Sequence, residues 1–308
     1  MIKLKRSSRN ILEVLSKRAF DLLSTEAAIV INSDKKPEQS GVSDRKGEHP
    51  KMGKVIAIAN QKGGVGKTTT SVNLGACLAQ MGKRVLIIDH DPQGNTTSGI
   101  GLKKSEIKHC IYDVLINEIP IEEVIIAPQF ERTQIETLKV VPATIRLAGA
   151  EAELVGMMAR DQRLKRAIEP IKDQFDYILI DCPPSLGNLT INALAAADSI
   201  IVPIQCEYYA LEGLSQLMKT IQLVQKYSNP SLKIEGVVLT MYDNRTNLSN
   251  QVTEEVRRYF QGKVYNTIIP RNIRLSEAPS FGLPITIYDE KSKGAEAYIE
   301  LAKEVNAQ

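Results

Sequence analysis

The sequence predicts an α/β protein with a doubly wound, mostly parallel sheet and helices on both faces. From residue 55 onward, short β-branched runs alternate with helical patterns, and the runs are apolar almost throughout. Strands of this kind are typical of parallel sheets that are buried on both faces. Right-handed crossovers place the carboxyl ends of parallel strands at one edge of the sheet. We therefore expect any ligand site to lie along that edge.

The elements follow one another in a regular order. Each short β-branched run is interpreted as a strand, and the longer segments between the runs are interpreted as helices. The expected strands are Val55–Asn60, Val85–Asp89, Leu138–Ala143, Tyr177–Asp181, Ser199–Ile204, Ile234–Tyr242 and Val264–Pro270. The expected helices are Lys67–Met81, Ala150–Ile171, Leu189–Ala197, Leu211–Tyr227, Leu248–Phe260 and Gly294–Asn306. Gly82 provides the stop signal of the first helix.

The composition is that of a globular protein. Of the 308 residues, 43% are hydrophobic and 24% are charged, and no run approaches the roughly 20 apolar residues that a membrane span needs. The four cysteines form no CxxC pair, so neither a disulfide framework nor a zinc site is expected. Together with the lack of a secretory signal, this pattern favours a cytoplasmic protein.

The chain divides into a basic extension, residues 1–51, and a single domain, residues 52–308. The extension holds eleven Lys and Arg against seven Asp and Glu, whereas the domain holds 28 against 29. Residues 2–30 have a helical pattern, and residues 32–51 have the polar, Gly- and Pro-containing composition of a linker. The extension is interpreted as a weakly structured solvated tail, as a segment that binds acidic lipid or DNA, or as untranslated sequence ahead of a start at Met52.

A Gly-rich segment, Gln61–Thr70 with the sequence QKGGVGKTTT, lies between the first expected strand and the first expected helix. Backbone N–H groups of such a loop, with the positive end of the helix, cradle phosphate oxygens. The residues expected to contact the nucleotide phosphates are Lys62, Gly63, Gly64, Val65, Gly66, Lys67, Thr68 and Thr69. This segment predicts a nucleoside triphosphate site.

Two side chains of the loop have specific roles in this interpretation. Lys67 would reach the β- and γ-phosphates, and the Thr68 hydroxyl would bind Mg²⁺. The strict pattern G-x-x-x-x-G-K-[ST] is not met, because Gln61 stands where the first Gly belongs. A second lysine, Lys62, follows it directly.

The string KGGVGKTT resembles the deviant Walker A motif of the ParA/MinD class of P-loop ATPases. Three further strings, IDHDPQGNTTSGIG, IDCPPSLG and IIPRNIRLSEAPSFGLPI, are similar to those of the chromosomal ParA proteins, often called Soj. The resemblance covers residues 52–308. It implies an ATPase that uses ATP and Mg²⁺ and partitions chromosomes or plasmids. Slow intrinsic turnover is expected, because no built-in arginine finger is evident near the phosphate motifs.

The resemblance also implies roles for individual charged residues. Lys62 would cross a dimer interface to the phosphates bound by the other subunit. Asp91 would orient the attacking water, and Asp181 would hold Mg²⁺ through a water molecule. Asp89 would support the magnesium site. For Asp89 and Asp91, capping of the turn before Pro92 is the alternative interpretation.

Later segments are similar to the base-binding and DNA-binding parts of the family. Pro270 and Asn272 would contact adenine, although turn formation alone could explain both residues. Arg245 and Arg274 would contact DNA phosphates without reading sequence, with solvated loop arginines as the alternative. The segment Gln205–Gly213 is a family signature to which we assign no role.

The partners implied are nonspecific DNA, a ParB-type centromere-binding protein and a second copy of the chain in an ATP-dependent homodimer. The expected location is the nucleoid of a bacterium. The alternative within the class is a MinD-like membrane-associated positioning ATPase, which needs a basic amphipathic C-terminal helix. The chain ends in AEAYIELAKEVNAQ, which has few bulky apolar residues. We therefore expect the tail to dock on the domain rather than on a membrane.

Overall fold

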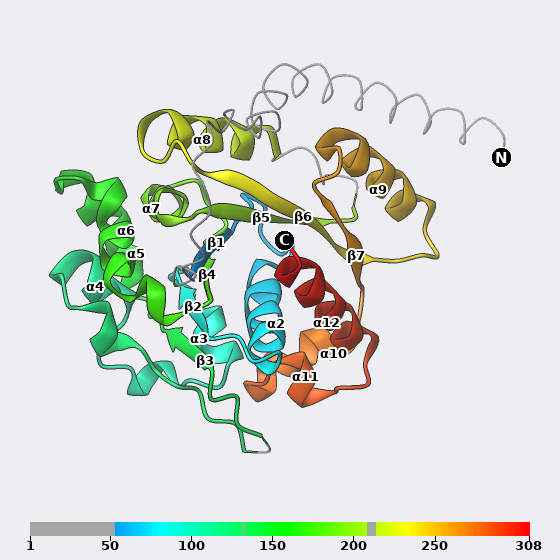
Figure 1. Ribbon diagram of the computed structural model, residues 1–308, viewed down its shortest axis with the longest axis horizontal. Helices are drawn as coiled ribbons and strands as arrows, with labels where there is room; N and C mark the ends of the chain where they lie inside the picture. The colour runs from blue at the N-terminus through cyan, green and yellow to red at the C-terminus, as the bar shows by residue number, and fades with distance from the viewer. Residues whose placement is uncertain (1–52, 132, 208–213) are drawn as a thin grey trace, which may run out of the picture.

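The computed structural model describes residues 53–131, 133–207 and 214–308. The seven strands of these residues form one parallel sheet in the order β3-β2-β4-β1-β5-β6-β7 (Figure 1). The strands are β1 (Lys54–Ile58), β2 (Val85–Asp89), β3 (Leu138–Val141), β4 (Tyr177–Asp181), β5 (Ser199–Gln205), β6 (Lys233–Tyr242) and β7 (Val264–Pro270). The predicted fold class is confirmed. The proposed extension, residues 1–51, lies outside the described residues.

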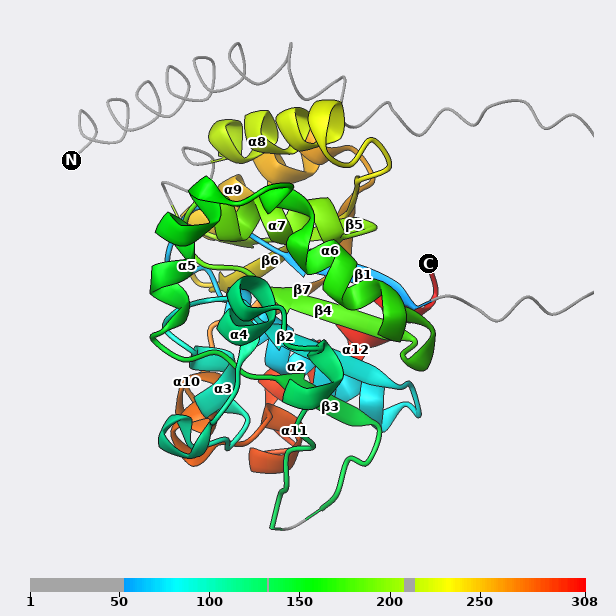
Figure 2. The same ribbon diagram turned by 90° about the vertical axis from the view of Figure 1, so that its left-hand side faces the viewer.

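Helices cover both faces of the sheet (Figures 1 and 2). Helices on one face are α4 (Ile111–Asn117), α5 (Leu147–Glu153), α6 (Arg163–Ile168), α7 (Asn188–Ala196), α8 (Leu214–Tyr227) and α9 (Asn247–Phe260). Helices on the other face are α2 (Lys67–Gln80), α10 (Ile273–Glu277), α11 (Ile285–Tyr288) and α12 (Lys293–Asn306). The short helix α3 (Asn95–Gly99) follows β2.

Short 3₁₀ turns join several of these helices. They are η2 (Lys104–Glu106), η3 (Ile121–Val124), η4 (Leu154–Gly156), η5 (Arg160–Gln162), η6 (Glu169–Gln174) and η7 (Ala278–Phe281).

The alternation of side chains along β1 explains why both faces carry a core. Val55 and Ala57 belong to the apolar cluster beneath α4–α9, whereas Ile56 and Ile58 belong to the cluster beneath α2 and α12. All four side chains are fully buried. A central strand with apolar residues at every position is thereby stabilised from both sides.

The expected single helix Ala150–Ile171 is wrong. The chain there forms α5, η4, η5, α6 and η6 in succession. Met157 has extended backbone after η4, and Ala159 has a φ of 48°, in the left-handed region that interrupts a right-handed helix. Pro170 then lies in the first turn of η6, where its missing N–H is tolerated.

The last helix docks on the domain, as the sequence predicts. Tyr298, Leu301 and Val305 of α12 are buried against α2 and β7. The Tyr298 hydroxyl lies 3.2 Å from the hydroxyl of Thr70 in α2. Among the described residues, no helix is both long and apolar enough to cross a membrane.

Candidate nucleotide site

The Gly-rich loop connects β1 to α2 at the carboxyl edge of the sheet, where the sequence places the ligand site. Gly64 and Gly66 have φ values of 72° and 90°, in the left-handed region that glycine adopts without a steric penalty. Gly66 is the N-cap of α2, which begins at Lys67. The loop therefore presents its backbone N–H groups together with the positive end of a 14-residue helix.

Two side chains hold the loop in this shape. The Asn60 amide donates to the Pro203 carbonyl of β5 at 2.7 Å, and its Oδ1 accepts from the Lys62 backbone N–H at 3.0 Å. The Thr240 hydroxyl of β6 donates to the Val65 carbonyl at 2.9 Å. Both contacts reach from the sheet to the loop, so the phosphate cradle is fixed by the sheet and not by the loop alone.

The two lysines of the loop lie in different surroundings. Lys67 is 7% exposed, and burial lowers the pKa of its ammonium group although the charges of Asp181 and Asp91 oppose this shift. Its Nζ donates to the Lys62 carbonyl at 3.1 Å, across the loop. Lys62 is partly exposed, and its side chain makes no ion pair within the described part of the chain.

A fully buried carboxylate, Asp181, ends β4 beside the loop. Its Oδ2 accepts from the hydroxyls of Thr68 and Thr96, each at 2.8 Å, and its Oδ1 accepts from the Ser71 hydroxyl at 3.1 Å. Burial is the main cause that raises the pKa of Asp181 to about 6. A nearby cation would stabilise the charged form of this carboxylate.

The residues around Asp181 suit magnesium bound together with a nucleotide. Hydroxyl and carboxylate oxygens are the hard donors that Mg²⁺ prefers, and phosphates and water complete its octahedron. No cluster of three or more His, Cys, Asp or Glu that could hold a metal occurs among the described residues. Thr68 and Asp181 are the residues that would hold Mg²⁺, and the ion would neutralise phosphate charge there.

The second carboxylate, Asp89 at the end of β2, is also fully buried. Its Oδ2 accepts from the backbone N–H and the hydroxyl of Thr97, at 2.7 and 2.6 Å. Its Oδ1 accepts from the Asp91 backbone N–H at 3.3 Å. Burial, followed by the charge of Asp181, raises the pKa of Asp89 to about 7. Protein donors contact both oxygens of Asp89, as they do at Asp181.

Asp91 lies in the turn after β2 and is 6% exposed. Its Oδ1 accepts from the Gln93 backbone N–H at 2.9 Å, which is the turn-capping contact offered as its alternative role. Asp91 is also close enough to the loop for its charge to raise the pKa of Lys67. The carboxylate thus combines a structural contact with a position at the phosphate site.

The residues predicted to bind adenine and DNA lie at the ends of β6 and β7. Pro270 ends β7, and the Asn272 Oδ1 caps α10 by accepting from the Arg274 backbone N–H at 2.8 Å. Arg245 lies in the turn between β6 and α9. Arg274 lies in α10, whereas the sequence analysis placed it in a loop.

The structure brings most of the predicted residues together and adds others that the sequence analysis missed. The missed residues fix the loop or bind the two buried carboxylates: Asn60, Ser71, Thr96, Thr97 and Thr240. Thr96 and Thr97 lie in the conspicuous string DPQGNTT, but hydroxyls that follow a turn are ordinary capping residues. Only the fold shows that they face carboxylates from separate strands.

A Gly-rich loop between a central parallel strand and a helix, with a buried lysine and a hydroxyl–carboxylate pair, defines a P-loop ATPase. A family model described as an AAA domain matches residues 53–234. The sporulation initiation inhibitor protein Soj of Bacillus subtilis is 64% identical over 256 residues, covering 83% of this chain and 99% of that protein. The chromosome partitioning protein ParA of Myxococcus xanthus is 56% identical, with 82% and 88% covered. The chain belongs to the ParA/Soj family of chromosome-partitioning ATPases, which use ATP and Mg²⁺.

Solved structures agree with the fold. A cobyrinic acid a,c-diamide synthase from Mycobacterium smegmatis with bound ADP and magnesium is 40% identical, with a TM-score of 0.71, covering 82% of this chain and 93% of that one. The cell division ATPase MinD of Pyrococcus furiosus is 28% identical, with a TM-score of 0.67, and the coverage is 83% and 99%.

Proposed function

We propose that ATP binding joins two copies of the chain through Lys62, and that the dimer binds DNA without sequence preference. The contrast between the two loop lysines carries this proposal. Lys67 is buried within its own loop, whereas Lys62 is partly exposed and makes no ion pair among the described residues. ATP has about one more negative charge at its γ-phosphate end than ADP, and a cation from a second subunit would respond to that difference.

Hydrolysis would end the dimeric state. In this scheme Asp91 orients the attacking water, while Thr68 and Asp181 hold Mg²⁺ against the β- and γ-phosphates. Loss of the γ-phosphate removes the group that Lys62 binds across the interface. The nucleotide shifts the equilibrium between monomer and dimer only by its differential affinity for the two states.

The DNA-binding surface would consist of Arg245 and Arg274. Both side chains are well exposed, 83% and 50%, beyond the carboxyl ends of β6 and β7. Two arginines in each subunit become four in a dimer, so dimerisation increases phosphate affinity without any new contact within a subunit. Pro270 and Asn272 would contact the adenine of ATP beside this surface.

A ParB-type centromere-binding protein would stimulate hydrolysis and release the ATPase from the nucleoid. The names of the relatives support this partner, since they are chromosome partitioning proteins from several bacteria. The active form on DNA would thus depend on the supply of ATP, and its release on the partner.

The test of the dimer is the variant Lys62→Ala, studied by gel filtration with magnesium and a non-hydrolysable ATP analogue. We expect the wild type to elute as a dimer and the variant as a monomer that still binds the nucleotide. Lys83→Ala is the matched control, because Lys83 lies just beyond the far end of α2, about 20 Å along the helix. A Lys62→Ala protein that remains dimeric contradicts the proposal.

Co-sedimentation distinguishes this function from the MinD-like alternative. The full chain is mixed with DNA or with anionic vesicles, each with and without ATP. We expect ATP-dependent binding to DNA only. Binding to vesicles without binding to DNA would favour the membrane-associated function.

A further inference from the structure

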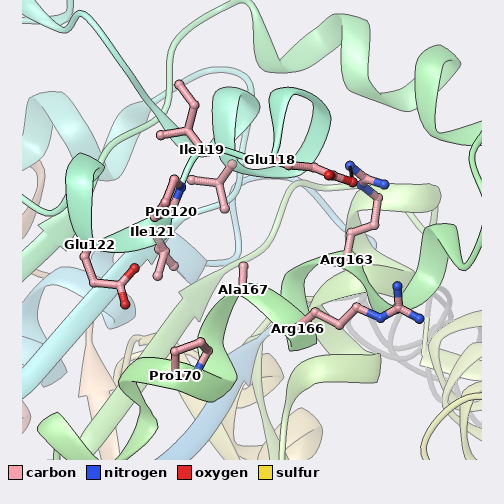
Figure 3. A pocket seen from close by; sticks show the side chains of 10 residues that line it. Glu118, Ile119, Pro120, Ile121, Glu122, Arg163, Arg166, Ala167 and Pro170 are labelled. Atoms are coloured by element: carbon pink, nitrogen blue, oxygen red, sulfur yellow. Dashed lines mark hydrogen bonds and ion pairs between the residues drawn. The ribbon is translucent and has the colours of Figure 1, made fainter.

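A pocket of about 460 Å³ lies between the α4–η3 segment and the α6–η6 segment, on the face of the sheet that carries α4–α9. Figure 3 shows Ala167 and Pro170 opposite Pro120 and Ile121, with Ile119 beside them. The volume is in the range of pockets that take small ligands or side-chain anchors. None of these residues belongs to the nucleotide site.

The rim of the pocket carries charges of both signs. Arg163 makes an ion pair with Glu118 at 2.8 Å. Arg166 and Glu122 lie at different ends of the pocket (Figure 3), and neither makes an ion pair with another described residue. The site therefore suits an amphipathic segment with mixed charge better than an apolar small molecule or a polyanion.

The amino-terminal end of the described chain adjoins this pocket. A Cβ on Gly53 would lie 2.4 Å from the carbonyl oxygens of both Lys172 and Phe175, so the chain enters the domain against η6. Pro170, in the first turn of η6, lines the pocket. The 52 residues that precede Gly53 therefore join the domain at η6, the turn whose first residues reach the pocket.

The sequence of residues 8–24 supplies a matching segment. On a helix, the side chains of one stripe are apolar: Ile11, Leu12, Leu15, Ala19 and Leu22. The remaining face holds the charged residues Glu13, Lys17 and Asp21, together with Val14 and Phe20. Helices that bind in grooves use anchors at this spacing.

The linker between this segment and Gly53 is long enough. For about 28 flexible residues the r.m.s. span is roughly 30 Å, about the width of a small domain. A tether of this kind gives a local concentration near the millimolar range, which favours the chain's own segment over a free partner.

We propose that residues 8–24 bind as an amphipathic helix in the pocket between α4–η3 and α6–η6 of the same chain, with the Ile11–Leu15–Leu22 stripe against Ile119, Pro120 and Ala167. The extension is thus an intramolecular ligand of the ATPase domain. The inference is independent of dimerisation and of DNA binding.

The experiment uses a fluorescent label at the rim of the pocket in the full chain. All four native cysteines are buried, so a Glu169→Cys substitution in exposed η6 gives one accessible thiol. We expect Leu15→Asp to shift the emission of the label, because the segment leaves the pocket. A synthetic peptide of residues 8–24, added to that variant, restores the original emission in a saturable manner.

Two controls make the result specific. The first control, Val14→Asp, changes the charge by the same amount outside the apolar stripe and should leave the emission unchanged. The second, Ala167→Arg in the pocket, should abolish the response to the peptide. ADP binding, measured on each variant, shows that the domain remains folded. Unchanged emission in Leu15→Asp overturns the proposal, and so does a response that disappears on dilution, since the ligand would then come from a second copy.

Discussion

The Asp91 carboxylate caps a turn and is proposed to orient the attacking water, and a pair of substitutions can separate the two roles. Its Oδ1 caps the turn through the Gln93 N–H, whereas its charge faces the phosphate loop. Asp91→Asn keeps an oxygen acceptor for the turn and removes the charge. Asp91→Ala removes both.

We expect both variants to bind ATP and to lose hydrolysis by about 100-fold, the scale of a positioned catalytic group. Both should therefore remain on DNA as ATP-bound dimers. Only Asp91→Ala should also lose about 1 kcal/mol of stability, because the Gln93 N–H is left unpaired. Phosphate release and urea unfolding measure the two effects. Normal turnover in Asp91→Asn would mean that Asp91 serves the turn alone.

His90, between the two aspartates, is fully buried, and the Leu189 backbone is the polar group that opposes the effect of this burial. Burial lowers its pKa to about 4, from 6.5. The unfolded chain therefore binds a proton that the folded chain does not, between about pH 6.5 and 4. The stability associated with neutral His90 is present above pH 6.5 and is lost as the pH falls.

We predict that His90→Leu stabilises the protein more at pH 5 than at pH 8, by about 2 kcal/mol, since 1.5 pH units of linkage are removed. The raised pKa values of Asp89 and Asp181 favour the folded state as the pH falls, which is opposite to the effect of His90. They do so in the wild type and in His90→Leu alike. The difference in stability between these two proteins therefore reports on His90. Urea unfolding at the two pH values measures it. The control is His109→Leu, at an exposed site, which should change stability equally at the two pH values. An equal effect of His90→Leu at both pH values would contradict the prediction.

At the scale of the elements, the sequence predicts strands better than it predicts helices and caps. All seven strands form near their expected positions, because a buried parallel strand is marked by its apolar run alone. The sequence wrongly predicts one helix from residue 150 to residue 171, because the apolar spacing continues across this whole segment. The extended backbone at Met157 and the left-handed backbone at Ala159 interrupt the helix there. The phosphate loop is likewise predictable, whereas the hydroxyls of Thr68, Ser71 and Thr96 come to Asp181 from distant positions that only the fold brings together.

The cap of α12 permits a prediction about an element. The Ser292 hydroxyl accepts from the Ala295 N–H at 3.1 Å and donates to the Asp289 carbonyl at 2.8 Å. Ser292→Ala should lower the free energy of unfolding by about 1 kcal/mol, or the melting temperature by about 3 °C. Ser292→Thr, which retains the hydroxyl, should recover most of the loss in thermal unfolding. Equal stability of the Ala and Thr variants would show that the cap contributes nothing.

At the scale of the whole molecule, each arginine of the proposed DNA surface is already paired with an acidic neighbour. Arg245 donates to both oxygens of Asp243 and holds the pKa of that carboxyl at about 2. Arg274 donates to Glu277 at 2.9 Å and lies 3.3 Å from Asp289. In the proposed DNA complex, phosphates would compete with these carboxylates for the same guanidinium groups.

This competition makes the effect of an acidic residue predictable. Glu277→Gln removes a competing charge beside Arg274 and should strengthen DNA binding a few-fold, while Arg274→Glu should weaken it equally for all DNA sequences. In a dimer, Arg274→Glu removes two phosphate contacts, so the slope of log affinity against log salt should fall by roughly 2. Salt titrations of ATP-dependent DNA binding measure both variants. Glu300→Gln is the matched control, because Glu300 pairs with Lys303 within α12 and with neither arginine of the proposed DNA surface. If Glu277→Gln and Glu300→Gln bind DNA alike and Arg274→Glu keeps the wild-type slope, then α10 is not part of the DNA-binding surface.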